Sequence, residues 1–541
     1  MSADDYTSFP PGTHMLDNQS KGNEKQDIIL NPTPSNDPDD PLNWSTLRKT
    51  VNFGLTCTYV FLTFVLLEIG SVAFDVYEAD LGLSLGNITQ AGGASYVGLA
   101  LGCLFTVPCV HRFGRRPLYL ISATIQLTCA IWYAKFKTAG EMIVIGLLSG
   151  LGASTSEAIV MITIVDLFFV HQHARMNGIF LFMQSLGSLG GPIAGGYIIL
   201  KMQWRWMWWI VAICLAANFL LVLFFFEESK FVPRTKAGYS KISKRYENSN
   251  ANDTSSTDSG DLSYGSDEPL YESNDKMESQ SYPRKTYFER FALVTKTEGP
   301  ILQNFYRPLF VPFIFPAVLF TATQYGMIQS WFTATTTAGS ELLKEAPYYF
   351  EPNDIGLFNL GGFVGCLLAT FTITFLSDWL AVQQARRNRG VFEPEMRLWL
   401  LFPAIVLNSV GSWIFGIGIS KGWHWMVLAV GNGIFGFGFM VTADVALTYL
   451  TDCYPLILND ALVGVVFIRN VFSMIVKFPF ASWLGAMGVQ NVFIMIGAIS
   501  FASMIVPGLF MIYGKHWRTR TSLKYTEYAA YQQSARPGTH H

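Results

Sequence analysis

Long apolar segments recur along this chain, and they constrain its fold more than any other feature. A helix needs about 20 mostly apolar residues to cross the hydrocarbon core of a bilayer. Twelve segments meet this requirement, and as α-helices they would satisfy their own backbone hydrogen bonds inside lipid. The segments are 51–73, 92–111, 117–136, 142–163, 176–200, 206–226, 308–333, 355–377, 397–419, 424–450, 460–485 and 490–514. We therefore predict an all-α membrane protein with twelve transmembrane helices.

The composition supports this fold class and argues against several functions. Asp, Glu, Lys and Arg make up 14% of the 541 residues, whereas soluble proteins carry about 25%. The net charge of −2 gives no sign of a nucleic-acid partner, and the seven cysteines lack metal-ligand spacing. The sequence also lacks a phosphate-binding glycine loop and a nucleophile–base constellation. We expect neither enzymatic activity nor a metal or other cofactor.

A polar stretch divides the chain into two halves. Residues 227–303 are rich in Ser, Asn, Asp and Glu, a composition that buries too little apolar surface to fold. We predict a disordered cytosolic linker there, between a six-helix half at 51–226 and a second at 304–514. Residues 1–50 and 515–541 are predicted to be cytosolic tails, since the polar start shows no signal-peptide pattern.

The two halves show related features. Short basic turns follow the second helix of each half, at Arg112–Arg116 and Arg386–Arg389. The fourth helix of each half carries two acids eight or nine residues apart. These pairs are Glu157 with Asp166 and Asp444 with Asp452. Such internal symmetry resembles the major-facilitator fold of two pseudo-symmetric six-helix halves, with the substrate site between them at the midplane.

Depth separates the two acids of each pair. At 1.5 Å per residue, Glu157 lies about 13 Å from Asp166, and the acids of the other pair lie about 12 Å apart. The first acid of each pair is expected near the bilayer midplane and the second near the cytosolic surface. A charge at the midplane costs roughly 2.5–3.5 kcal/mol, which favours a function for Glu157. The interpretations are a proton carrier, a partner for a substrate charge, or a neutral acid hydrogen-bonded between helices.

Two cations lie on the eleventh apolar segment. Arg469 and Lys477 are eight residues apart, about 80° apart around a helix. Arg469 could hold Asp444 in a purely structural ion pair, and Lys477 could extend toward the membrane surface. If both cations instead face the cavity, its mixed charge favours an anionic or zwitterionic substrate over a simple cation.

The seventh apolar segment carries amides and aromatic rings. Gln324, Tyr325, Gln329 and Trp331 lie close together there. Aromatic side chains with a polar tip suit an amphipathic substrate, and we predict Gln324 and Tyr325 as site residues. The alternative is the aromatic belt found at membrane interfaces.

The outer end of the first apolar segment is acidic. Glu68 and Asp75 are seven residues apart and would share one face of a continuous helix. They indicate either an acidic vestibule that attracts cations or ordinary helix-end acids. Basic residues favour an orientation with both termini in the cytosol. Asn87 then begins an external Asn-Ile-Thr acceptor sequence for glycosylation.

The basic turns and the cytosolic acids indicate a gate. We predict that Asp166 and Asp452 pair with the turn arginines, closing the cytosolic side in one state and opening it in another. In the first half these arginines are Arg112, Arg115 and Arg116. This role is mechanical and does not involve substrate binding.

A glycine-rich motif lies in the fifth apolar segment. Residues 187–196 fit the pattern Gly-x-x-x-Gly-Pro-x-x-Gly-Gly. Small residues clear one helix face for close approach of a second backbone, and a proline needs neighbouring groups to satisfy the carbonyl that it frees. We predict a face on which helices slide or bend, with simple tight packing as the alternative. The gating residues are Gly187, Gly191, Pro192, Gly195 and Gly196.

Several motifs resemble those of one family. The glycine motif is similar to the fifth-helix signature of drug:proton antiporters in the major facilitator superfamily. The segment 36–44 resembles the amino-terminal signature of fungal twelve-helix members, and 385–397, 452–455 and Arg469-Asn470 resemble further family segments. Within that family the chain looks most like the branch that contains the yeast histidinol and polyamine permease. The resemblance covers about residues 30–520, and it implies functional acids at Asp75, Glu157, Asp166, Asp444 and Asp452.

Two features depart from the family pattern. The turn after the second helix usually begins with Asp, and here His111 stands at that position. The polyamine branch has an acid in the seventh helix where this chain has Tyr325, and it lacks cations where Arg469 and Lys477 stand. These changes argue against polyamine specificity.

The resemblance implies a proton-coupled secondary transporter. Efflux of a small organic compound, such as a drug or a fungal secondary metabolite, is the first expectation. The alternative is a proton-driven uptake permease for polyamines or related organic cations, and a third reading is a substrate-sensing receptor without net flux. The expected partners are a small organic substrate, protons and the lipid bilayer. We expect a monomer in the plasma membrane, with the vacuolar membrane as the alternative.

Overall fold

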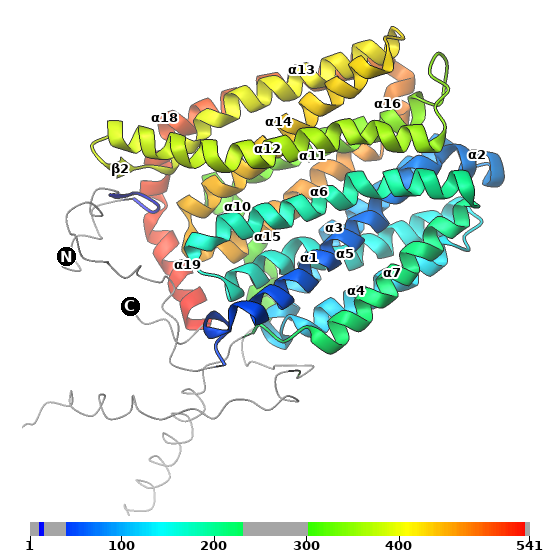
Figure 1. The fold of residues 1–541 in the computed structure, drawn as a ribbon. Helices are drawn as coiled ribbons and strands as arrows, with labels where there is room; N and C mark the ends of the chain where they lie inside the picture. Colours follow the sequence, from blue (N-terminus) through cyan, green and yellow to red (C-terminus); the bar gives the residue numbers. More distant parts are fainter. Residues whose placement is uncertain (1–9, 16–38, 231–290, 292–300, 536–541) are drawn as a thin grey trace, which may run out of the picture.

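The computed structural model describes residues 10–15, 39–230, 291 and 301–535, so most of the predicted linker lies outside the described residues. Within them, long helices lie side by side in one bundle (Figure 1). The first half contains η3 (Pro41–Asn43), α1 (Thr46–Glu68), η4 (Ile69–Ala73), α2 (Phe74–Leu81), α3 (Leu85–Phe113), α4 (Arg116–Tyr133), α5 (Ala139–Leu167), α6 (Val170–Lys201) and α7 (Trp204–Phe225). The second half contains α10 (Ile301–Ile314), α11 (Pro316–Leu342), α12 (Pro352–Arg387), η6 (Pro394–Leu400), α13 (Leu401–Ser420), α14 (Trp425–Cys453), η7 (Pro455–Ile457), α15 (Leu458–Lys477), α16 (Phe480–Met487), α17 (Val489–Ala502), α18 (Ile505–Arg520) and α19 (Ser522–Ala535).

The described helices match the predicted membrane segments one by one. By length and composition, eight helices of the described chain could cross a membrane, or ten when two bent pairs each count as one span. The two remaining predicted segments correspond to α4 and α6, which have 18 and 32 residues. The predicted all-helical fold is confirmed.

Some predicted spans are bent. α10 meets α11 at 99°, so the predicted segment 308–333 is divided between two helices, the second of which begins at Pro316. α15 and α16 meet at 46° beside Pro479, because a proline removes a backbone donor and clashes with the preceding turn. The 3-10 turn η4 separates α1 from α2. Glu68 and Asp75 therefore lie on either side of a 3-10 turn, within one candidate span of residues 46–81.

Several helices begin where the sequence supplies a capping side chain. Ser45, Ser84 and Thr138 accept hydrogen bonds from backbone amides in the first turns of α1, α3 and α5. α12 begins with a capping box formed by Glu351 and Asp354. Each cap satisfies amides that a helix end leaves without a partner, and it stabilises the helix by about 1 kcal/mol.

Glycines bring α3 and α5 into close contact. A Cβ atom at Gly98 would lie 2.1 Å from the carbonyl oxygen of Leu147, and one at Gly150 would lie 1.9 Å from that of Ser95. Only glycine permits this approach of the two backbones. The contact fixes α5, which carries Glu157, against α3.

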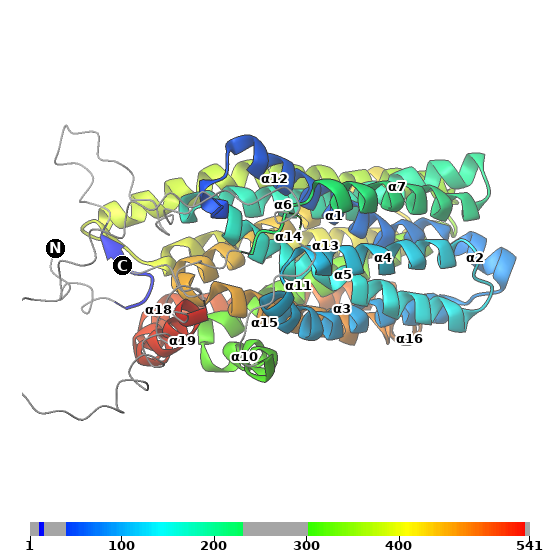
Figure 2. The ribbon, with the colours of Figure 1, turned by 90° about the horizontal axis from the view of Figure 1, so that it is seen from below.

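One end of the bundle carries additional structure beyond the membrane segments. β1 (His14–Met15) and β2 (Val391–Phe392) form a two-stranded antiparallel sheet. α19 packs through Tyr525 on Tyr454 and through Tyr528 on Phe315, with ring centroids 5.5 and 5.7 Å apart. Figures 1 and 2 show β1, α18 and α19 at the same end, which we call the sheet end. Residues 515–535, predicted as part of a tail, are therefore helical.

Candidate transport site

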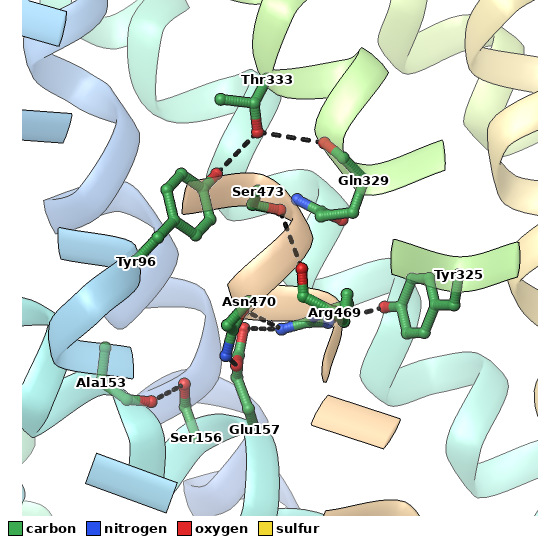
Figure 3. Close-up of polar contacts among 10 residues, drawn as sticks. All are labelled: Tyr96, Ala153, Ser156, Glu157, Tyr325, Gln329, Thr333, Arg469, Asn470 and Ser473. Atoms are coloured by element: carbon green, nitrogen blue, oxygen red, sulfur yellow. Dashed lines mark hydrogen bonds and ion pairs between the residues drawn. The ribbon is translucent and has the colours of Figure 1, made fainter. Parts of the chain in front are cut away.

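Glu157 and Arg469 form an ion pair between the two halves. The Nη2 atom of Arg469 on α15 donates to Oε1 of Glu157 on α5, and Nδ2 of Asn470 donates to Oε2 at 2.8 Å (Figure 3). Glu157 and Arg469 are each 2% exposed. Buried ions lose their hydration, so they need both a partner and additional hydrogen bonds. Asn470 provides such a bond.

Tyr325 on α11 extends this pair. The Nη1 atom of Arg469 donates to the Tyr325 hydroxyl at 3.0 Å, and its guanidinium carbon lies 4.9 Å from the ring centroid. Tyr325 also lines a pocket, described below. We call Glu157, Arg469, Asn470 and Tyr325 the central cluster. A ligand that moves Tyr325 can therefore move Arg469.

A second polar contact joins the halves beside the central cluster. Tyr96 on α3 and Thr333 on α11 share a hydrogen bond of 2.8 Å between their hydroxyl groups. Thr333 also donates to the backbone carbonyl of Gln329 at 3.1 Å (Figure 3). Tyr96 was not predicted as a site residue, because it lies in an apolar segment without a motif. Asn470 was given no role, although it directly follows Arg469.

A narrow pocket lies beside Tyr325, between α6, α11, α12 and α14, and its lining residues include no charged side chain. Phe332 and Phe439 stack there with ring centroids 5.0 Å apart. Among the described residues, Oε1 of the buried Gln329 has no hydrogen-bond partner. The polar lining residues are Gln184, Ser185, Ser188, Tyr325, Gln329 and Cys366. Aromatic faces and a few polar groups suit a small organic ligand.

Two predicted site residues lie elsewhere. Gln324 donates through Nε2 to the carbonyl of Ser503 at 3.4 Å, beside the break between α17 and α18, and it does not line the pocket. Asp444 is half-buried on α14. The ion partner of Arg469 is Glu157, so the interpretation that Arg469 pairs with Asp444 is wrong.

Lys477 extends between the two halves. Its Nζ atom donates to the hydroxyl of Thr337 on α11. Its Cε atom lies against α3, 2.6 Å from the position of a Cβ at Gly92. Lys477 is thus part of the contact between α3, α11 and α15, and the interpretation that it reaches the membrane surface is wrong.

At the end opposite the sheet, Lys344 binds acids from both halves. Its Nζ atom lies 3.3 Å from Asp75 and 3.0 Å from Glu78 on α2, and 3.1 Å from Glu341 on α11. Burial lowers the pKa of Lys344, but the hydrogen bonds to Glu78 and Glu341 and the nearby charges outweigh it, so the pKa is raised above the ordinary value. We call these four residues the lysine cluster. Asp75 lies there and not beside the pocket.

At the sheet end, the turn before α4 is held by two carboxylates. Nε of Arg115 donates to Asp166 at 2.8 Å. The Glu228 carboxylate accepts from the backbone amides of Arg115 and Arg116 at 2.9 and 3.0 Å. Glu228 was not predicted as a site residue, although the turn has His111 where the family usually has an acid. The gating role of this turn stays a prediction.

The other groups of this turn make backbone contacts. Nη2 of Arg116 donates to the carbonyl of Leu223 at 2.6 Å. The exposed Arg112 accepts at its carbonyl from Nζ of Lys230 at 3.1 Å. Burial, together with the nearby Arg115, lowers the pKa of Lys230 to about 8. These contacts fix the turn to the end of α7 and the residues that follow it.

The second half has a related ion pair. Asp452 accepts from Nε of Arg397 at 2.6 Å, and Nη1 of Arg397 donates to the Ser377 hydroxyl at 2.6 Å. Arg397 lies in η6, eight residues beyond Arg389 of the predicted turn, and the prediction did not name it as a partner. The contact joins α14, η6 and α12.

The glycine motif places α6 directly on α1. A Cβ atom at Gly187 would lie 2.5 Å from the carbonyl oxygen of Phe61. Gly191 and Gly195 continue the same face, against Val65 and Ile69. Side chains at these positions would separate the two helices.

The other face of the motif contacts the second half. A Cβ atom at Gly196 would lie 2.4 Å from the carbonyl oxygen of Pro352, at the start of α12. The carbonyl oxygen of Pro192 lies 2.8 Å from the position of a Cβ at Gly356. One motif thus contributes both to the packing within the first half and to the contact between halves.

Asn87 lies in the first turn of α3. The third residue of its acceptor sequence, Thr89, is 1% exposed, and its hydroxyl donates to the carbonyl of Gly86 at 3.0 Å. Glycosylation acceptors lie on the surface, so this geometry does not favour modification. Glycosylation at Asn87 stays a prediction.

Comparison with known proteins decides the class of the chain. Residues 54–476 match the profile described as "Major Facilitator Superfamily". The chain belongs to this superfamily. This major-facilitator protein is therefore a multi-pass membrane transporter for a small solute, and not an enzyme.

Fungal transporters are among its relatives. It is 30% identical to an uncharacterized MFS-type transporter of Schizosaccharomyces pombe, over 97% of this chain and 95% of that one. It is 27% identical to protein HOL1 of Saccharomyces cerevisiae, over 92% of each chain. It is 26% identical to the MFS transporter cpaT of Aspergillus oryzae, over 89% of this chain and 90% of that one.

Solved structures support the fold of this major-facilitator protein. The human organic anion transporter MFSD10 (TETRAN) aligns with a TM-score of 0.53 at 12% identity, over 86% of this chain and all of that one. A POT family transporter in complex with 5-aminolevulinic acid aligns with a TM-score of 0.54 at 13% identity, over 88% of this chain and 96% of that one.

Proposed function

We propose that this transporter exports a small organic compound in exchange for protons, as a drug:proton antiporter does, and that Glu157 carries the proton. The ion pair between Glu157 of the first half and Arg469 of the second supports the proposal most directly. It is the contact at which protonation of one buried carboxylate changes the attraction between halves. Compounds of the expected kind are drugs and fungal secondary metabolites.

Protonation biases the transport cycle through the ion pair. When Glu157 binds a proton, the buried Arg469 loses its counter-ion. The contact between α5 of the first half and α15 of the second then becomes less stable. When the proton leaves, the pair forms again and stabilises the contact. A ligand or proton shifts a conformational equilibrium only when its affinity differs between the two states. The charge of Arg469 supplies that difference for the proton.

The pocket provides a way for the affinity of the substrate, too, to differ between the two states. Tyr325 touches both the pocket and Arg469, so a bound compound and a proton act on the same guanidinium. The two stacked rings, and the Gln329 oxygen that has no partner among the described residues, suit an uncharged aromatic compound that can donate a hydrogen bond. An uncharged substrate also avoids the cost of placing an unpaired charge in the pocket.

Uptake of polyamines or related organic cations is the second candidate. The resemblance to the permease branch and the acids Asp75, Glu78 and Glu341 favour it. These acids, however, already bind Lys344, and the described residues that line the pocket include no carboxylate. Export of an uncharged compound therefore has the stronger support.

We assign the sheet end to the cytosol and the protein to the plasma membrane, with the vacuolar membrane as the alternative. Arg115, Arg116 and the exposed Arg386, Arg387 and Arg389 lie toward this end, and basic residues concentrate on cytosolic loops. The acids of the lysine cluster then face outward.

Labelled spermidine separates the two candidates. Its accumulation is measured in cells that lack their own polyamine permease, with and without this protein, in acidic and in neutral medium. We expect expression to leave accumulation unchanged or lower. Accumulation that rises with expression and requires an acidic medium would instead establish a cation importer.

A further inference from the structure

Residues 10–15 lie on the second half, although they precede the first half in the sequence. Their strand β1 pairs antiparallel with β2, with His14 opposite Phe392 and Met15 opposite Val391 (Figure 1). Residues 16–38 connect this segment to the first half, which begins with the buried Asp39 and Asp40. We call residues 10–15 the docked segment.

Arg518 on α18 holds the docked segment. Its Nε and Nη2 atoms donate to the Glu395 carboxylate at 2.8 and 2.6 Å. Its Nη1 atom donates to the carbonyl of Pro11 and to the hydroxyl of Thr13, the latter at 3.2 Å. Arg518 is 1% exposed. Without the segment, this buried guanidinium would lose two acceptors, and an unsatisfied buried donor is costly.

Gly12 lies directly on the backbone of the second half. Its φ angle is +83°, and a Cβ atom would lie 2.4 Å from the carbonyl oxygen of Asp452 and 3.1 Å from Cα of Cys453. Both the backbone conformation and the contact thus require glycine. Asp452 is also the residue whose carboxylate binds Arg397. The docked segment therefore packs on the backbone of the residue whose carboxylate joins α14 to η6.

We propose that this end of the second half is a peptide-binding site, filled in cis by residues 10–15, and that its occupancy holds the Asp452–Arg397 pair in place. The site takes an extended segment with a central glycine. Strand addition to β2 and the bond from Arg518 to the Pro11 carbonyl recognise the main chain. The bond from Arg518 to Thr13 recognises a side-chain hydroxyl, and the close contact at Asp452 selects glycine. Because the segment belongs to the same chain, its effective concentration is high. The inference depends on neither the proton nor the substrate.

Hydrogen exchange on the full-length protein tests this proposal. Gly12→Ala is compared with Gly488→Ala, because Gly488 has a φ angle of +75° and a Cβ there would meet no atom within 4 Å. Both variants strain the backbone, and only the first clashes with Asp452. We expect amides of residues 391–400 and 450–457 to exchange about tenfold faster in Gly12→Ala, and at the wild-type rate in Gly488→Ala. Equal rates in all three proteins would overturn the proposal.

A truncated chain tests recognition of the segment itself. A variant without residues 2–15 should show the same fast exchange in those two regions. A synthetic peptide of residues 8–17 should restore protection, whereas the same peptide with Gly12→Val should not. If truncation leaves exchange unchanged, or if both peptides protect equally, the second half has no specific site for this segment.

Discussion

Glu157 on α5 and Arg469 on α15 form an ion pair that joins the two halves, and each residue is 2% exposed. Asn470 and Tyr325 add hydrogen bonds to this pair. The contact between halves thus depends on one carboxylate whose charge a single proton removes. The proposed coupling of proton and substrate follows from this dependence, since Tyr325 also lines the pocket.

Removing one partner of the pair should destabilise the protein more than removing both. Arg469→Gln leaves the Glu157 carboxylate buried without a cation, which should lower the free energy of unfolding by about 3–5 kcal/mol. The double variant Glu157→Gln, Arg469→Gln places two neutral amides together and should recover most of this loss. Thermal unfolding in detergent measures the effect. If the double variant loses the sum of the two single losses, the residues do not interact directly.

Two buried glutamines on α11 provide a matched test of the pocket. Gln329 lines it, and Gln324 lies outside it. Benzamide, benzoate and benzylamine share one ring and differ in charge, and we expect benzamide to bind most tightly, as measured by calorimetry. Gln329→Leu should weaken that binding about tenfold through loss of one hydrogen bond. Gln324→Leu should leave it unchanged. Preference for either charged compound would contradict an uncharged substrate.

Lys344 should keep the end opposite the sheet closed. Lys344→Gln removes the cation shared by Asp75, Glu78 and Glu341, so an impermeant maleimide should label a Ser340→Cys reporter a few-fold faster. Lys421→Gln alters an exposed lysine and serves as the control. If the two substitutions have the same effect, the lysine cluster does not close this end.

The raised pKa of Lys344 determines how the stabilisation from the lysine cluster changes with pH. The stabilisation from this lysine is fully present below its unfolded-state pKa of about 10.4. It is lost only as the pH rises through the higher folded-state value. Maleimide labelling itself speeds up in alkaline medium because the thiolate is the reacting form, so the measured quantity is the ratio of the Ser340→Cys labelling rates with Lys344→Gln and with Lys344 intact. A shift from neutral to mildly alkaline medium should leave this ratio unchanged. A fall of the ratio toward one over that range would contradict the geometry of the lysine cluster.

Substitutions in the glycine motif should impair the protein where the glycine touches a neighbouring helix, and should have no effect where it does not. Gly196→Ala places a Cβ 2.4 Å from the carbonyl oxygen of Pro352, whereas at Gly190 the nearest atom would be 3.7 Å away, on Leu186. We expect Gly196→Ala to slow transport and lower the unfolding temperature, because α6 and α12 must separate. Gly190→Ala should behave like the wild type. Similar behaviour of both variants would show that the close contact is not needed.

The helices could be predicted from sequence because each depends on a local property, the length of an apolar segment. The ends and bends were harder to predict. The start of α11 at Pro316 depends on how α10 packs, and the apolar residues before Pro316 read as a continuation of the same span. Similarly, Gly70 and Ser71 lie in the 3-10 turn that separates Glu68 from Asp75, and such a pair permits a break in a helix without requiring one.

The candidate site was predictable only residue by residue. A buried acid and a buried arginine in apolar segments each required an explanation, and both belong to the central cluster. Their pairing was not predictable, because Glu157 and Arg469 lie 312 residues apart in sequence. Gln324 and Gln329 look alike in sequence, and only the rotation of α11 places one at the pocket and the other at α17. The docked segment was missed because its binding depends on Arg518, at the far end of the chain.

Proton movement in proteoliposomes tests the central claim most directly. The protein is reconstituted with a pH-sensitive dye, and proton flux is followed when a transported compound is added. We predict that Glu157→Gln abolishes compound-dependent proton flux and keeps exchange of labelled for unlabelled compound. Glu141→Gln, at the start of the same helix, where Glu141 accepts from Thr138 at 3.0 Å, should behave like the wild type. If Glu157→Gln still moves protons with the compound, or concentrates it against a gradient, Glu157 is not the coupling residue.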